Sequence, residues 1–107
     1  MAIIAMCMPI LAGKMEKWQA MMDHVQSTPD FANSRETAGV HERTFVQRTP
    51  AGDFLIITME GDDPAASWAQ IMSTMPPEFA EFAQDVHGLD LSAPAPPLPE
   101  LVFDSRA

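Results

Sequence analysis

Residues 41–61 read HERTFVQRTPAGDFLIITMEG, two runs rich in β-branched and aromatic side chains on either side of Pro-Ala-Gly. Such runs around a short turn-forming segment are typical of an antiparallel β-hairpin. Thr49-Pro50-Ala51-Gly52 suits a type I turn, because proline stands at the second position and glycine at the fourth. The hairpin is therefore the segment from which the rest of the fold can be laid out.

The register of this hairpin decides which polar side chains meet, and the turn leaves two registers open. A three-residue loop with a glycine bulge places Glu42 opposite Glu60 and Thr44 opposite Thr58. A loop of the alanine and glycine alone instead pairs Arg43 with Glu60. Two carboxylates side by side would raise one pKa, which is how a general acid is made. The alternative register predicts a plain cross-strand ion pair.

The segments around the hairpin predict one α+β domain over residues 1–107. Residues 2–10 are apolar on both faces, which is typical of a strand covered on both sides. Helical periodicity marks 15–25, 29–38, 64–75 and 79–87, and a proline-rich connector over 92–99 leads to a last strand, ELVFD. Its prolines suit a sheet edge. This order is the ferredoxin-like β-α-β-β-α-β arrangement with a four-stranded antiparallel sheet.

The apolar first strand also predicts a partner. The helices can cover only one face of the sheet, while residues 2–10 present apolar side chains to both. A second copy of the sheet would cover the other face, so we expect a homodimer through the sheet face. The alternative is a monomer whose own tail shields that face.

Composition narrows the class of function. The chain has 107 residues, 47% of them hydrophobic, and a net charge of −9. Such an acidic protein would repel nucleic acid and anionic membrane. Cys7 is the single cysteine, which fits a reducing compartment. The apolar start lacks a basic segment and contains Pro9, unlike a signal peptide. We expect a cytoplasmic protein.

Two segments carry a resemblance to a known superfamily: GVHERTFVQRTPAGDFLIITMEGDDPAASWA, residues 39–69, and VHGLDLSAPAPPLPELVFD, residues 86–104. The chain resembles the dimeric α+β barrel superfamily, and most nearly small stand-alone bacterial proteins of unknown function within it. That superfamily includes cofactor-independent monooxygenases, haem-degrading monooxygenases and isomerases. The resemblance implies the same fold, and it leaves the reaction open because the scaffold carries many chemistries.

The candidate catalytic residues are His87, Glu42 and Glu60. His87 stands at the end of a predicted helix, just before Gly88, where an imidazolium would interact well with the helix C-terminus. Helix capping therefore explains His87 without any reaction. The alternative is that its ring turns into a cleft between helices and sheet and moves a proton, alone or with the two glutamates.

The candidate ligand-binding residues lie on the predicted helices and on the predicted strands. Arg35 and Arg43 could orient an anionic group, because a guanidinium binds carboxylate or phenolate in a bidentate fashion. Salt bridges to neighbouring acids are the alternative role for both arginines. The remaining candidates are polar or aromatic side chains beside the predicted cleft, namely Thr44, Thr58, Trp68 and Phe82.

Metal and haem are weakly indicated. His24, His41 and His87 lack the short spacings of zinc ligands, so no metal site is predicted. Resemblance to the haem-degrading members implies an asparagine on the first strand, a tryptophan and a helical histidine. Trp68 and His87 could supply two of these, but the first strand has no asparagine. Haem is therefore a minor alternative, and no cofactor is expected.

These observations predict a small homodimeric barrel protein that binds a small, largely apolar molecule. By resemblance it would act as a cofactor-independent monooxygenase or as an isomerase. A non-catalytic ligand-binding or dimerisation module is the alternative.

Overall fold

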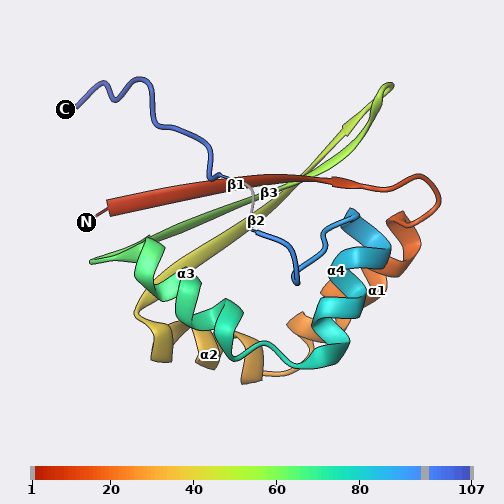
Figure 1. The fold of residues 1–107 in the computed structure, drawn as a ribbon, viewed down its shortest axis with the longest axis horizontal. Coiled ribbons are helices and arrows are strands. Elements are labelled where there is room, and N and C mark those ends of the chain that lie inside the picture. The colour runs from red at the N-terminus through yellow and green to blue at the C-terminus, as the bar shows by residue number, and fades with distance from the viewer. Residues whose placement is uncertain (1, 95–96, 107) are drawn as a thin grey trace.

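The computed structural model describes residues 2–94 and 97–106, an α+β arrangement in which four helices cover one face of an antiparallel sheet (Figure 1). Within this part of the chain the sheet has three strands, in the order β1-β3-β2. The elements follow one another as β1 (Ala2–Ile10), α1 (Met15–Gln26), α2 (Asp30–Ala38), β2 (Val40–Thr49), β3 (Gly52–Gly61), α3 (Pro64–Ser73) and α4 (Pro77–His87). The α+β class and the positions of these strands and helices agree with the sequence prediction.

The β2–β3 hairpin takes neither of the two expected registers. Thr49 pairs with Gly52, so the loop consists of Pro50 and Ala51 alone. Glu42 consequently lies opposite Met59, and Glu60 lies opposite His41. The prediction failed because it placed Gly52 in the loop, whereas Gly52 is the first residue of β3.

Strand alternation separates the side chains into a helix-covered face and a helix-free face. Even-numbered residues of β1 and β2 and odd-numbered residues of β3 point towards the helices, and they include the buried Met6, Val40, Leu55 and Met59. The helix-free face carries Ile3, Ala5 and Cys7 from β1, His41, Arg43 and Phe45 from β2, and Ile56, Thr58 and Glu60 from β3. Ile3 and Phe45 are about half exposed there.

Two buried clusters fill the space between sheet and helices. One lies beneath α3 and consists of Met6, Val40, Met59 and Ile71. The other joins β1 and β3 to α1 and α4, and consists of Ile10, Trp18, Leu55 and Val86. By contrast α2 contains no fully buried residue.

Turn chemistry sets the ends of the helices. The Asp63 carboxylate accepts a hydrogen bond from the Ala66 N–H at 3.2 Å, and Pro64 begins α3, as expected for a cap followed by a first-turn proline. Gly88 ends α4 in the left-handed conformation, with φ of 69°.

At Gly61 the backbone of β3 lies too close to the backbone at the end of α2 to leave room for a side chain. A Cβ built on Gly61 would lie 2.5 Å from the carbonyl oxygen of Gly39, at the end of α2. The start of β2 can therefore lie against the end of β3 only because residue 61 has no side chain.

The expected fourth strand over 100–104 does not join this sheet, since those residues lie outside its three strands. Residues 97–106 instead extend on the side of the sheet opposite the helices (Figure 1). In the described part of the chain, no helix is long and apolar enough to cross a membrane.

Candidate ligand-binding cleft

One face of α2 presents an aromatic ring and a guanidinium to the interior. Phe31 and Arg35 are four residues apart on this helix, so their side chains lie one above the other. The Arg35 Cζ atom lies 4.0 Å from the centroid of the Phe31 ring, a cation–π contact. Ser34 supports the arrangement, because its hydroxyl donates to the Phe31 carbonyl and accepts from Arg35 Nη1 at 3.1 Å.

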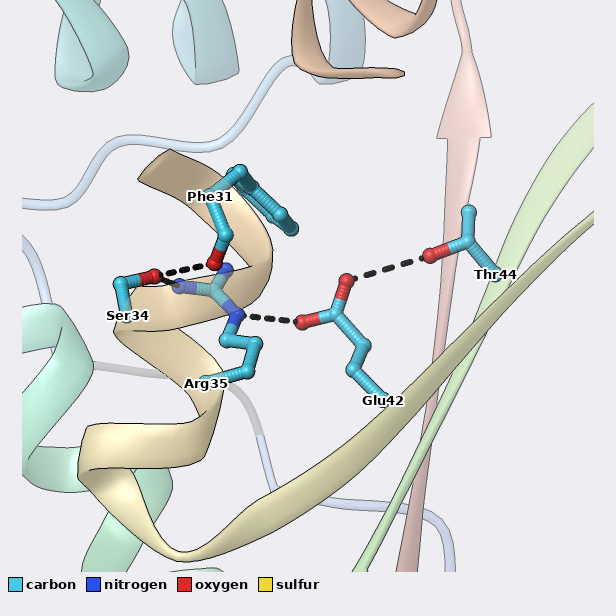
Figure 2. Close-up of polar contacts among 5 residues, drawn as sticks. All are labelled: Phe31, Ser34, Arg35, Glu42 and Thr44. Carbon is cyan, nitrogen blue, oxygen red and sulfur yellow. Dashed lines mark hydrogen bonds and ion pairs between the residues drawn. The ribbon is translucent and has the colours of Figure 1, made fainter. Parts of the chain in front are cut away.

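The sheet supplies the matching carboxylate. Glu42 projects from the helix-covered face of β2, and Arg35 Nε donates to its Oε1 atom at 2.8 Å (Figure 2). The Thr44 hydroxyl lies 3.2 Å from the second carboxylate oxygen. Only 15% of the Arg35 side chain and 9% of the Glu42 side chain are exposed. This is a largely desolvated ion pair with both carboxylate oxygens engaged.

Two cavities flank this ion pair. The larger, of about 450 Å³, lies between the end of α1, α2, α3 and the start of α4. The smaller, of about 330 Å³, lies between α1, α2 and β2. Phe31 and Arg35 of α2 and Val25 of α1 line both, so these side chains lie between the two cavities. Apolar walls dominate the larger cavity, and they include Ile71, Met75 and Phe79.

Arg35 is a polar anchor that both cavities share, in mostly apolar surroundings. The guanidinium of Arg35 has five N–H donors, and its bonds to Glu42 and Ser34 engage two of them. Because Glu42 already neutralises Arg35, a neutral acceptor such as a carbonyl or hydroxyl fits this anchor better than a second carboxylate. The Glu42 carboxylate lies beside that anchor and lines the smaller cavity, whereas Asp30 lines the larger one.

Glu60 does not belong to this cleft. It lies on the helix-free face with Arg43 and Thr58, whereas Glu42 and Thr44 lie on the helix-covered face. The expected Glu42–Glu60 pair is therefore wrong, and so is the expected Thr44–Thr58 pair. Glu60 contacts Arg43 diagonally at 3.6 Å, with both side chains more than one-third exposed.

His87 points inward, but not into either cavity. The residue is 6% exposed, and its Nδ1 atom lies 2.8 Å from the Pro9 carbonyl oxygen. A carbonyl can only accept, so Nδ1 carries the proton and donates. Burial lowers the pKa of His87 below its ordinary value, and the Pro9 carbonyl opposes that shift. His87 thus ties the end of α4 to β1 as a neutral ring and not as the charged helix cap.

The two remaining candidates lie in the core. Trp68 packs, partly buried, against the cluster beneath α3, and Phe82 packs against the cluster that contains Trp18. Neither side chain lines the two cavities. His87 does not line them either.

Of the nine candidates, the fold brings together Arg35, Glu42 and Thr44. Sequence reasoning missed Phe31 and Ser34, which hold the guanidinium in place. The signal available for Phe31 was its spacing of four residues from Arg35 on a predicted helix.

Within residues 2–94 and 97–106, no group of three histidine, cysteine, aspartate or glutamate side chains could hold a metal ion. Comparisons of the chain with protein-family models, with curated proteins and with solved structures find no match.

Proposed function

We propose that the protein binds a small, largely apolar molecule in the larger cavity, with a neutral polar group of that molecule directed to Arg35. The observation that carries this proposal is an apolar cavity of about 450 Å³ whose wall includes Arg35, while the carboxylate that pairs with it, Glu42, lines the adjoining smaller cavity. Ligand pockets are typically about 300–1,000 Å³, mainly apolar, with a few polar groups that fix orientation.

The proposal keeps the homodimeric α+β barrel as the form in which the protein works. The apolar side chains exposed on the helix-free face, such as Ile3 and Phe45, support a second sheet on that side. The four-stranded ferredoxin-like arrangement belongs to the same proposal, since the present sheet has one strand fewer.

Binding of a neutral fluorescent probe, N-phenyl-1-naphthylamine, tests the cavity directly. We expect micromolar binding and at least a tenfold loss in Gln70→Trp, because Gln70 lines the larger cavity and an indole there would fill it. Ala69→Trp is the matched control, since Ala69 is an exposed neighbour on α3 outside the cavity. Absence of binding by the wild type, or equal losses in both variants, would contradict the proposal.

The chemistry that suits this site best is proton transfer of the isomerase kind. For a bound molecule that extends past Arg35 into the smaller cavity, which Glu42 lines, Glu42 would take a proton from a carbon beside a carbonyl and return it to the same or a neighbouring carbon. Arg35, which lines both cavities, would stabilise the intermediate oxygen anion. A cofactor-independent monooxygenase would begin with the same deprotonation, with dioxygen as co-substrate and the bound molecule as reductant.

Deuterium exchange at C1 of 2-tetralone in D₂O, followed by NMR, separates catalysis from binding. We expect exchange faster than in buffer with the wild type, and loss of that acceleration in Glu42→Gln. His87→Ala should retain it, since His87 lies outside both cavities. Exchange no faster than in buffer would instead identify a non-catalytic ligand-binding module, which the two engaged oxygens of Glu42 favour.

A further inference from the structure

The C-terminal segment exposes three consecutive large apolar side chains. Leu101, Val102 and Phe103 are 67%, 85% and 79% exposed, respectively. Single exposed apolar residues are ordinary on a protein surface, whereas a contiguous run of this kind marks an interaction site. Residues 97–106, which we name the arm, therefore make few contacts with their own chain.

The arm is built to stay extended and to reach far. Pro97 and Pro99 fix their own φ angles and favour an extended chain. Residues 97–104 span about 26 Å at about 3.3 Å per residue, and Ser105 and Arg106 form a turn. An arm of this length can lie along most of a strand of a second copy.

The outer half of β2 is a matching surface. β2 is an edge strand of the described sheet, and its residues 43–48 are exposed apart from Val46. Phe45 is 52% exposed, with Arg43 and Arg48 on either side of it in sequence. An unpaired edge with apolar side chains readily accepts another strand.

Charge favours the same pairing. In an extended arm Glu100 lies on the opposite face from Leu101 and Phe103, and on β2 Arg48 lies on the opposite face from Phe45. An antiparallel arm with Phe103 beside Phe45 therefore has Glu100 beside Arg48. The chain has six basic residues against fifteen acids. Four of the six contact acids of their own chain: Lys14 and Lys17 bind Asp85, Arg35 binds Glu42, and Arg43 contacts Glu60. Arg48 is thus the cation that β2 offers to Glu100 of the arm.

The end of the arm points away from the outer half of β2 in its own chain. In Figure 1 it lies on the same side of the view as the N-terminus, opposite the β2–β3 turn. We propose that the arm of each copy lies along β2 of a second copy, in a reciprocal twofold exchange. The arm then supplies in trans the fourth strand that this sheet lacks. This inference is independent of the proposed ligand.

Sedimentation velocity of the full chain gives the first test. We expect a particle of twice the 11.7 kDa mass of one chain, and at least a tenfold weaker dimer in Leu101→Asp/Phe103→Asp. Because both side chains are exposed in a single copy, circular dichroism should show an unchanged fold. Ala20→Asp/Ala69→Asp adds the same charge on exposed helix positions and should leave the dimer intact. A monomeric wild type, or an unaffected arm variant, would overturn the inference.

Charge reversal tests the exchange itself. Arg48→Glu sets a glutamate against Glu100 of the arm, and Glu100→Lys sets a lysine against Arg48 of β2. Each variant alone should dimerise at least tenfold more weakly than the wild type. Mixed in equal amounts they should dimerise, because both arm–β2 contacts in the mixed pair join opposite charges. No association on mixing would show that the arm does not pair with β2 of another copy.

Discussion

The two ends of the helical layer differ in how they are filled. Where α1 and α4 meet the sheet, Trp18 and Val86 are buried in a continuous cluster, and His87 bonds to the backbone of β1. Where α2 meets the sheet, no residue of α2 is fully buried, and two cavities flank the Arg35–Glu42 ion pair. We call the α1–α4 end the filled end and the α2 end the hollow end. The polar side chain of His87 at the filled end stabilises the packing of α4 on β1, whereas Arg35 at the hollow end is available to a ligand.

Substitutions that remove an aromatic ring at each end should show the largest contrast. We expect Trp18→Ala to lower the free energy of unfolding by about 3–5 kcal/mol, because the ring is 5% exposed and its loss leaves a cavity. Phe31→Ala should cost only about 1 kcal/mol, since this partly exposed ring already borders two cavities. Urea unfolding followed by circular dichroism measures both. Equal losses would mean that the α2 end is packed as tightly as the other.

The ion pair at the hollow end should contribute next. Glu42→Gln leaves the Arg35 guanidinium without its counter-charge in a largely desolvated site, which should cost about 1–3 kcal/mol. Glu60→Gln is the matched control, because its contact with Arg43 is long and exposed and should be worth less than about 0.5 kcal/mol. The same unfolding measurement decides the point, and similar losses for the two variants would contradict it.

Substitution of His87, at the filled end, should have the smallest effect on the free energy of unfolding, and this effect should be confined to acidic pH. Its pKa in the folded protein lies below the ordinary 6.5 because the ring is buried. Below about pH 6.5 the unfolded chain therefore takes up a proton that the folded protein does not, and stability falls as the pH falls. We expect His87→Asn, which retains a donor for the Pro9 carbonyl, to lose this part of the pH dependence. His24→Asn, at an exposed position, should keep it.

Local patterns predicted the elements well, since apolar periodicity and caps such as Asp63-Pro64 act over a few residues. They failed where a single residue of register decided the outcome, because moving Gly52 from loop to strand put Glu42 and Glu60 on opposite faces. The inward direction of His87 depends on the position of the Pro9 carbonyl, 78 residues away in sequence. No local pattern carries that information. Arg35 and Glu42 were both named as candidates, but their pairing depends on where α2 sits over β2.

The contact between the end of α2 and the end of β3 limits how this sequence can vary. Any residue other than glycine at position 61 brings a carbon atom to within 2.5 Å of the Gly39 carbonyl oxygen, so relatives that keep this hairpin and helix in place should keep the glycine. Arg43, Gln47 and Pro50 are exposed on the same hairpin and carry no such restriction. Gly61 is thus a better marker for recognising distant relatives than the candidate catalytic residues His87, Glu42 and Glu60.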